Sequence, residues 1–77
     1  MKIKISFMKM LDIKKVDNDS YIEIKAGSTV KELLEFLEIK KYPLSAISVM
    51  VNGAPAWRST VLQENDKVHL LVSLGGG

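Results

Sequence analysis

Hydrophobic and polar residues alternate in two stretches near the start of the chain. Residues 2–7 read KIKISF and residues 21–25 read YIEIK, and in both the apolar side chains occupy every second position. A period of two is typical of a β-strand with one buried face. The stretch between them, residues 12–20, is polar and rich in Asp and Asn, which favours a turn or loop. The two strands therefore predict an antiparallel hairpin.

The pattern then changes to the period of an α-helix. Apolar residues at the spacing i, i+3, i+4 and i+7 form one stripe, made of Val30, Leu33, Leu34 and Leu37. Thr29 followed three residues later by Glu32 predicts a capping box at the helix start. Pro43 prevents continuation of the helix. Lys40 and Lys41 are expected at the helix end, where positive charge suits the helix dipole.

The second half of the chain returns to strands. Residues 46–51 form a β-rich run, followed by the hairpin turn signal Asn52-Gly53 and a short return strand over 54–57. Residues 67–74 are a last strand. The predicted order is strand, strand, helix, strand, short strand, strand. This order predicts an α+β fold in which one helix covers one face of a small mixed sheet, with the first and last strands paired in parallel.

Composition narrows the possible functions. The chain has 77 residues, which indicates one domain, and no cysteine, which excludes disulfides and thiolate–metal sites. A net charge of +2 on a mixed-sign sequence is not the pattern of a nucleic-acid-binding protein. No stretch resembles a secretory signal or a membrane span, so a cytoplasmic protein without membrane or nucleic-acid partners is expected. His69 is the single histidine and is more typical of a surface residue than of a catalytic or metal site.

The sequence ends in three glycines, Gly75, Gly76 and Gly77. Glycine loses the most conformational entropy on ordering, so residues 75–77 are predicted to be a flexible arm behind a domain formed by residues 1–74. A strip without Cβ atoms can enter a narrow enzyme channel and present its terminal carboxylate. An ordinary frayed end is the alternative interpretation.

The tail and the order of elements together resemble the MoaD/ThiS family of sulfur carriers, which have the ubiquitin-like β-grasp fold. The resemblance covers most of the chain. It rests on KIKISF, AGSTVKELLEFL, VMVNG and LQENDKVHLLVSLGGG, the last of which is similar to the turn, closing strand and diglycine end of the family. Asn65 stands where the family turn usually has glycine, and Asn also tolerates a left-handed backbone.

The resemblance implies a chemical role for the tail. Gly77 would be adenylated at its carboxylate and converted to a thiocarboxylate, Gly76 is the second member of the diglycine, and Gly75 adds reach. The domain itself would bind no cofactor or metal. ATP and Mg would be used by a ThiF/MoeB-type adenylating enzyme. The sulfur would pass to a synthase, either the large subunit of molybdopterin synthase or thiazole synthase; in the first case the chain would be the small subunit of such a complex.

A docking surface is expected on the sheet face opposite the helix. Strand alternation places Met50, His69 and Leu71 together there, at positions that correspond to the recognition patch of ubiquitin-like folds. Val72 and Leu74 are predicted to leave the sheet and to insert into the partner.

Two neighbouring residues are given structural interpretations: Trp57 is predicted to pack in the core or at an edge, and Arg58 to be solvated. Two other functions remain open. One is a protein modifier that acylates lysines through the same activated terminus. The other is an interaction module with an accidental glycine tail.

Overall fold

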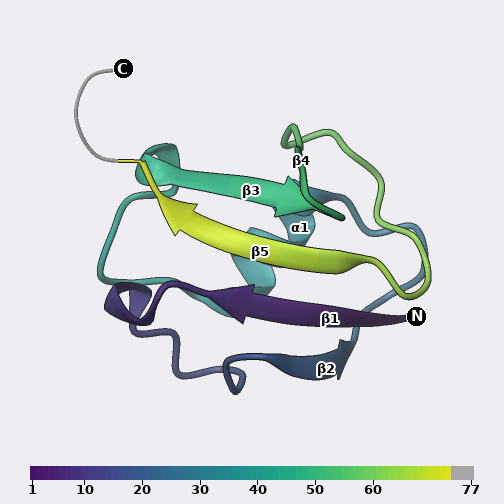
Figure 1. Ribbon diagram of the computed structural model, residues 1–77, viewed down its shortest axis with the longest axis horizontal. Helices are drawn as coiled ribbons and strands as arrows, with labels where there is room; N and C mark the ends of the chain where they lie inside the picture. The colour runs from purple at the N-terminus through teal and green to yellow at the C-terminus, as the bar shows by residue number, and fades with distance from the viewer. Residues whose placement is uncertain (74–77) are drawn as a thin grey trace.

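The computed structural model describes residues 1–73, which form one mixed sheet with an α-helix behind it (Figure 1). The strands lie in the order β2-β1-β5-β3-β4. In chain order the elements are β1 Lys2–Phe7, the 3₁₀ turn η1 Lys9–Leu11, β2 Ser20–Glu23, α1 Val30–Leu37, the 3₁₀ turn η2 Leu44–Ala46, β3 Ile47–Val51, β4 Ala54–Pro55 and β5 Lys67–Val72. The predicted α+β fold is confirmed. No helix in the described part of the chain is long and apolar enough to cross a membrane.

The centre of the sheet is the parallel pair β1 and β5. Their register aligns Lys4 with Lys67 and Phe7 with Leu70. The predicted hairpin of β1 with β2 is antiparallel, and β3 pairs antiparallel with the other side of β5. β4, which contains Pro55, is a two-residue strand at the sheet edge. Proline has no N–H to donate, and an edge strand tolerates this because one of its sides has no neighbouring strand. The parallel pairing of β1 with β5 confirms the pairing predicted for the first and last strands.

The core lies between the sheet and α1. The four residues of the helix stripe are at most 1% exposed and join alternate residues of β1, β3 and β5 in one cluster. Thr29 caps the helix as expected: its Oγ1 accepts the Glu32 N–H, and its own N–H donates to the Glu32 carboxylate. Hydrogen bonds from the Thr29 backbone and side chain hold the pKa of Glu32 below its usual value.

The helix ends earlier than the lysines that follow it. Glu38 is the C-cap and has a left-handed backbone with φ of 51°, so α1 stops at Leu37. The prediction that Lys40 and Lys41 lie at the helix terminus is wrong, because the last turn contains no basic residue. Both lysines instead belong to the segment that connects α1 to η2.

The turn between β3 and β4 also supports the start of β5. Asn52 and Gly53 both have positive φ, 52° and 82°, as a two-residue hairpin turn requires. The Asn52 side chain donates to Asp66 at 2.8 Å and accepts the Lys67 N–H at 2.9 Å. β5 then ends at Val72 rather than at residue 74. The predicted domain boundary at residues 74 and 75 lies outside the described residues.

Truncation of the helix stripe tests the assigned core. We expect Leu34→Ala to lower the free energy of unfolding by about 2–4 kcal/mol, because it leaves a cavity at a position only 1% exposed. Glu35→Ala, at the exposed neighbouring position, should change it by less than about 0.5 kcal/mol. Urea titration of both variants measures the difference. Equal losses would show that the buried face of the helix is misassigned.

Candidate functional site

The sheet face opposite α1 brings together three of the predicted docking residues. Met50 of β3 pairs directly with His69 of β5, and Leu71 pairs with Ser48. Each of Met50, His69 and Leu71 is partly exposed. Because side chains two positions apart on a strand share one face, Leu71 is the diagonal neighbour of Met50. The expected contiguity of these three residues is thus present in the strand register. We call Met50, His69 and Leu71 the outer-face patch.

The outer-face patch is bordered by a hydrogen bond between two central strands. Ser6 lies opposite His69 in the parallel register, and its Oγ is 2.7 Å from His69 Nδ1. This bond fixes one ring nitrogen and leaves the rest of the imidazole to the outer face. Sequence reasoning missed it, although the alternation of both strands places the two residues on the same side. The missing information was the register, which only the paired strands define.

Beside the outer-face patch lies a shallow groove of about 310 Å³. Met50, His69 and Ser6 form part of its lining, and Lys4, Lys67 and Asp19 contribute charge. Lys4 is 3.4 Å from Asp19. The outer face is therefore apolar towards Leu71 and charged towards the start of β5. A partner docking here meets both kinds of surface.

Val72 is located differently from the prediction. It pairs with Ile47 as the last residue of β5 and packs against the core cluster. Its N–H donates to Met8 Sδ at 3.4 Å. The expectation that Val72 leaves the sheet is wrong, because its side chain has the core-facing parity of Val68 and Leu70. Ser73 follows, and its N–H donates to the Ala46 carbonyl at 2.7 Å.

The remaining predicted site residues, Leu74, Gly75, Gly76 and Gly77, lie outside the described residues. The last described residue, Ser73, is held to η2 by the bond from its N–H to the Ala46 carbonyl. We call Val72 and Ser73, with their bonds to Met8 and Ala46, the tail root.

Trp57 and Arg58 both differ from the environments predicted for them. Trp57 is 76% exposed, so its assignment to core or edge packing is wrong. The surrounding loop bonds to itself and to the helix: the Trp57 N–H donates to Thr60 Oγ1, and the Thr60 carbonyl accepts the Val30 N–H. Arg58, predicted to be solvated, donates to the Leu44 carbonyl at 2.6 Å and to the Ile47 carbonyl at 2.8 Å. No periodic pattern marks isolated loop residues of this kind.

The described residues contain no cluster of three or more His, Asp or Glu side chains that could hold a metal ion. Within residues 1–73, the candidate site combines the outer-face patch, the tail root and one Ser–His hydrogen bond.

Comparison with solved structures identifies the fold class. SAMP1 of Haloferax volcanii aligns with a TM-score of 0.69 at 15% identity, covering 100% of both chains. A second structure of this small archaeal modifier protein 1 gives 0.70 at 15% identity, covering 95% of this chain and 98% of the other. A protein described as molybdopterin converting factor, subunit 1, from Pyrococcus furiosus gives 0.72 at 20% identity with the same coverage. These alignments show that the chain has the ubiquitin-like β-grasp fold.

The family follows from the sequence. The profile of the ThiS family matches residues 10–77, and the chain belongs to that family. A comparison with curated protein sequences finds no significant match. ThiS family proteins are small carrier proteins rather than enzymes.

The two bonds of Arg58 predict a mutation that loosens the tail root. Arg58→Ala leaves the Leu44 and Ile47 carbonyls without this donor, and we expect the free energy of unfolding to fall by about 1–3 kcal/mol. Because η2 also accepts the Ser73 N–H, hydrogen exchange at that amide should accelerate. Two-dimensional NMR measures the exchange. Arg58→Lys keeps the charge but not the planar fork and should be intermediate. Unchanged Ser73 exchange in Arg58→Ala would contradict this coupling.

Proposed function

We propose that this protein is a sulfur carrier whose Gly77 carboxylate is activated by adenylation and then converted to a thiocarboxylate. The observation that supports this most is the extent of the family match, which runs through residue 77 and so includes the glycine end. Three glycines before the carboxylate suit the chemistry because no side chain crowds the carbon that is attacked.

The reaction requires an activated carboxylate. A carboxylate oxygen of Gly77 attacks the α-phosphorus of ATP and pyrophosphate leaves, which gives a mixed anhydride with AMP. Hydrosulfide then attacks the acyl carbon, the bond to the AMP oxygen breaks, and AMP and a proton are released. The product carries sulfur in place of one carboxylate oxygen. ATP and Mg are held by the adenylating partner, of the ThiF/MoeB type, and hydrosulfide supplies the sulfur.

The domain contributes docking and positioning to this reaction. In the proposal the outer-face patch contacts the adenylating enzyme and afterwards the enzyme that accepts the sulfur. Met50 and Leu71 supply apolar area there, and His69 is oriented by Ser6. Leu74, which follows the tail root, is proposed to contact the partner directly. The accepting enzyme is a molybdopterin synthase large subunit or a thiazole synthase; the structural similarity to a molybdopterin converting factor subunit 1 favours the former. A cytoplasmic location fits both partners.

The second candidate function is protein modification. Both Haloferax volcanii neighbours are structures of a small archaeal modifier protein, which supports this reading. A modifier uses the same adenylate, but the acyl carbon is attacked by the amine of a target lysine and becomes an isopeptide bond. Target peptides that carry a glycine remnant from Gly77 on lysine would establish this function, whereas a thiocarboxylate alone supports the carrier.

Removal of the last residue tests the activated group. We expect the intact protein, incubated with its adenylating enzyme, Mg-ATP and sulfide, to gain the mass of one oxygen replaced by one sulfur. A chain lacking Gly77 should show no gain, because the partner channel then meets a carboxylate one residue too short. Intact-mass spectrometry provides the measurement, and circular dichroism should show the same fold in both. Equal yields from the two chains would contradict the proposal.

A charge placed in the outer-face patch tests docking. Leu71→Asp buries a carboxylate against an apolar partner surface, so kcat/KM for adenylation should fall at least about tenfold. Tyr21→Asp is the matched control, because Tyr21 lies on the same sheet face but on the outer strand β2 and is 60% exposed. Steady-state kinetics with varied carrier concentration compare the two. A similar effect of both variants would show that the patch is not the contact surface.

A further inference from the structure

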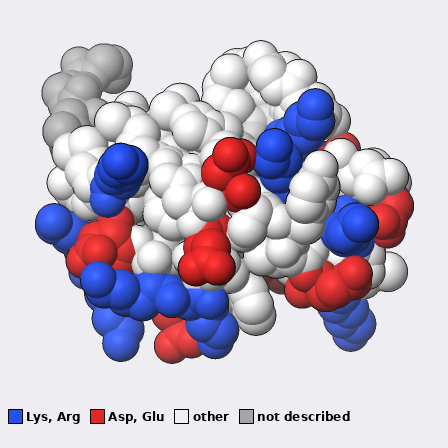
Figure 2. All heavy atoms as spheres, turned by 60° about the horizontal axis from the view of Figure 1, so that its bottom comes forward, with Lys and Arg blue, Asp and Glu red and all other residues white. Residues whose placement is uncertain are grey.

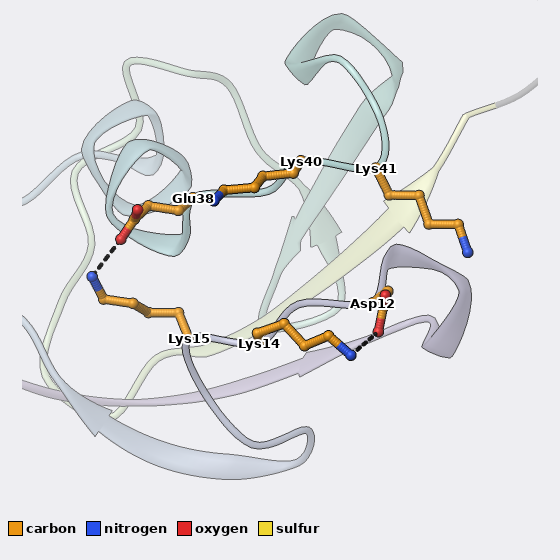
Figure 3. Close-up of a pocket in the computed structure, with 6 residues that line it drawn as sticks. All are labelled: Asp12, Lys14, Lys15, Glu38, Lys40 and Lys41. Atoms are coloured by element: carbon orange, nitrogen blue, oxygen red, sulfur yellow. Dashed lines mark hydrogen bonds and ion pairs between the residues drawn. The ribbon is translucent and has the colours of Figure 1, made fainter.

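Four of the eleven basic side chains of this protein gather in one place. Two loops meet around an open cavity of about 510 Å³ (Figure 3), which we call the lysine cluster and which is lined by Lys14, Lys15, Lys40, Lys41, Asp12 and Glu38. Four lysines and two carboxylates give this cluster a formal charge of +2. That equals the formal charge of the whole chain, so the other charged side chains balance one another.

Only half of the lysines are neutralised within the lysine cluster. Lys14 Nζ lies 2.9 Å from Asp12 Oδ1, and Lys15 Nζ lies 2.6 Å from Glu38 Oε2 (Figure 3). The hydrogen bond and charge of Lys14, with a smaller effect of Lys41, hold the pKa of Asp12 below its usual value. Lys15, with a smaller effect of Lys40, does the same for the pKa of Glu38.

The second pair of lysines has no such partner. Among the ion pairs of residues 1–73, none includes Lys40 or Lys41. Both side chains are exposed. These two ammonium groups are therefore available to an external anion.

The backbone that carries the lysine cluster is fixed by buried neighbours. Leu11 and Ile13 flank Asp12 and are 0% and 8% exposed. On the other loop, Ile39 and Tyr42 pack against the core on either side of the lysine pair. The lysines thus project from two anchored segments rather than from free loops, which lowers the entropy lost when they bind.

The lysine cluster lies at the same end of the molecule as the tail root. One loop follows η1, which begins one residue after Met8, the acceptor of the Val72 N–H. The other leads into η2, whose Ala46 accepts the Ser73 N–H. Figure 1 shows η1, η2 and the end of β5 together at the left end of the molecule. Figure 2 shows a group of basic side chains, with carboxylates among them, at that same end.

We propose that the lysine cluster docks an acidic surface patch of the adenylating partner protein, beside the opening that receives the C-terminal glycines; this rests on the proposed function. Lys40 and Lys41 pair with carboxylates of the partner. The other two lysines of the cluster keep their ion pairs with Asp12 and Glu38. The positive charge of the lysine cluster, beside the tail root, attracts the acidic patch and turns the C-terminal end of the carrier towards the partner. The outer-face patch, on a different surface, supplies apolar contact.

Charge arrangement favours a protein surface over a compact polyanion or a nucleic acid. Asp12 and Glu38 stand between the lysines, so a triphosphate placed in the cavity would meet two carboxylates at close range. A surface with separated carboxylates can reach Lys40 and Lys41 without that repulsion. Nucleic-acid binding needs an extended basic stripe, and this cluster has a net charge of only +2.

The experiment compares two double charge reversals in the full chain. Lys40→Glu/Lys41→Glu removes the proposed contacts. Lys25→Glu/Lys31→Glu makes the same change of charge at two exposed lysines that follow β2 and begin α1. Stopped-flow measurements give the association rate constant with the purified adenylating enzyme over a range of NaCl concentrations, and pyrophosphate exchange gives the rate at saturating carrier.

We expect the first variant to associate on the order of tenfold more slowly than the control variant at low salt, with the difference shrinking as NaCl rises. The exchange rate at saturation should be unchanged, and Lys40→Arg/Lys41→Arg should associate like the original chain. The inference is overturned if both charge-reversal variants associate equally slowly, or if neither associates more slowly than the original chain. Tighter binding of the original chain to oligo-dT than to the enzyme also overturns it. If the original chain binds but is never adenylated, the proposed function fails instead.

Discussion

The parallel pairing of β1 with β5 is the constraint on which the rest of this structure depends. It joins residues more than sixty positions apart, such as Ser6 and His69. Because the two strands run in the same direction, the chain leaves β5 at the end where η1 follows β1. The same pairing buries Ile5 and Val68 against α1 and turns Ser6 and His69 outward. Tail position, core and outer face are thus consequences of one contact.

Strand alternation places the core residues on one face of the sheet and the outer-face patch on the other. On β5, Val68 and Leu70 are buried, while His69 and Leu71 between them remain partly exposed. A one-residue shift in register would exchange these sets and remove both the core and the outer-face patch. The Asn52 side chain opposes such a shift, because it bonds Asp66 and the Lys67 N–H just where β5 begins. The stability of the fold and the outer-face patch therefore depend on the same register.

The sequence predicted what depends on periodicity and local chemistry. β1 has the predicted bounds, the helix begins at the Thr29 cap, and the turn at Asn52 has the expected positive φ. What it could not predict depends on segments that meet only in space. The loop that carries Trp57 and Arg58 is tied to α1 and to η2 by backbone carbonyl bonds, and no pattern within the loop encodes that.

The functional region shows the same division between local pattern and tertiary arrangement. Met50 and His69 were predicted to share a face, but their direct pairing needs the strand register. Val72 was expected to leave the sheet although it lies within the predicted last strand, and its pair with Ile47 keeps it in β5. The lysine cluster combines Lys14 and Lys15 with two lysines from the loop that follows α1 in the chain. Its positive charge looks like two unrelated solvated runs until the fold brings them together.

In the proposed function the reacting group is the terminal carboxylate, so little chemistry is needed within the domain. The sequence has no cysteine and so no side-chain thiol, and the proposed thiocarboxylate would place sulfur on the main chain. Both proposed fates begin with the same adenylate, and they differ in which nucleophile reaches the acyl carbon. That choice is made by the protein that next holds the arm. The domain influences it through surfaces that select partners, so the outer-face patch and the lysine cluster are where carriers and modifiers of this fold should differ most.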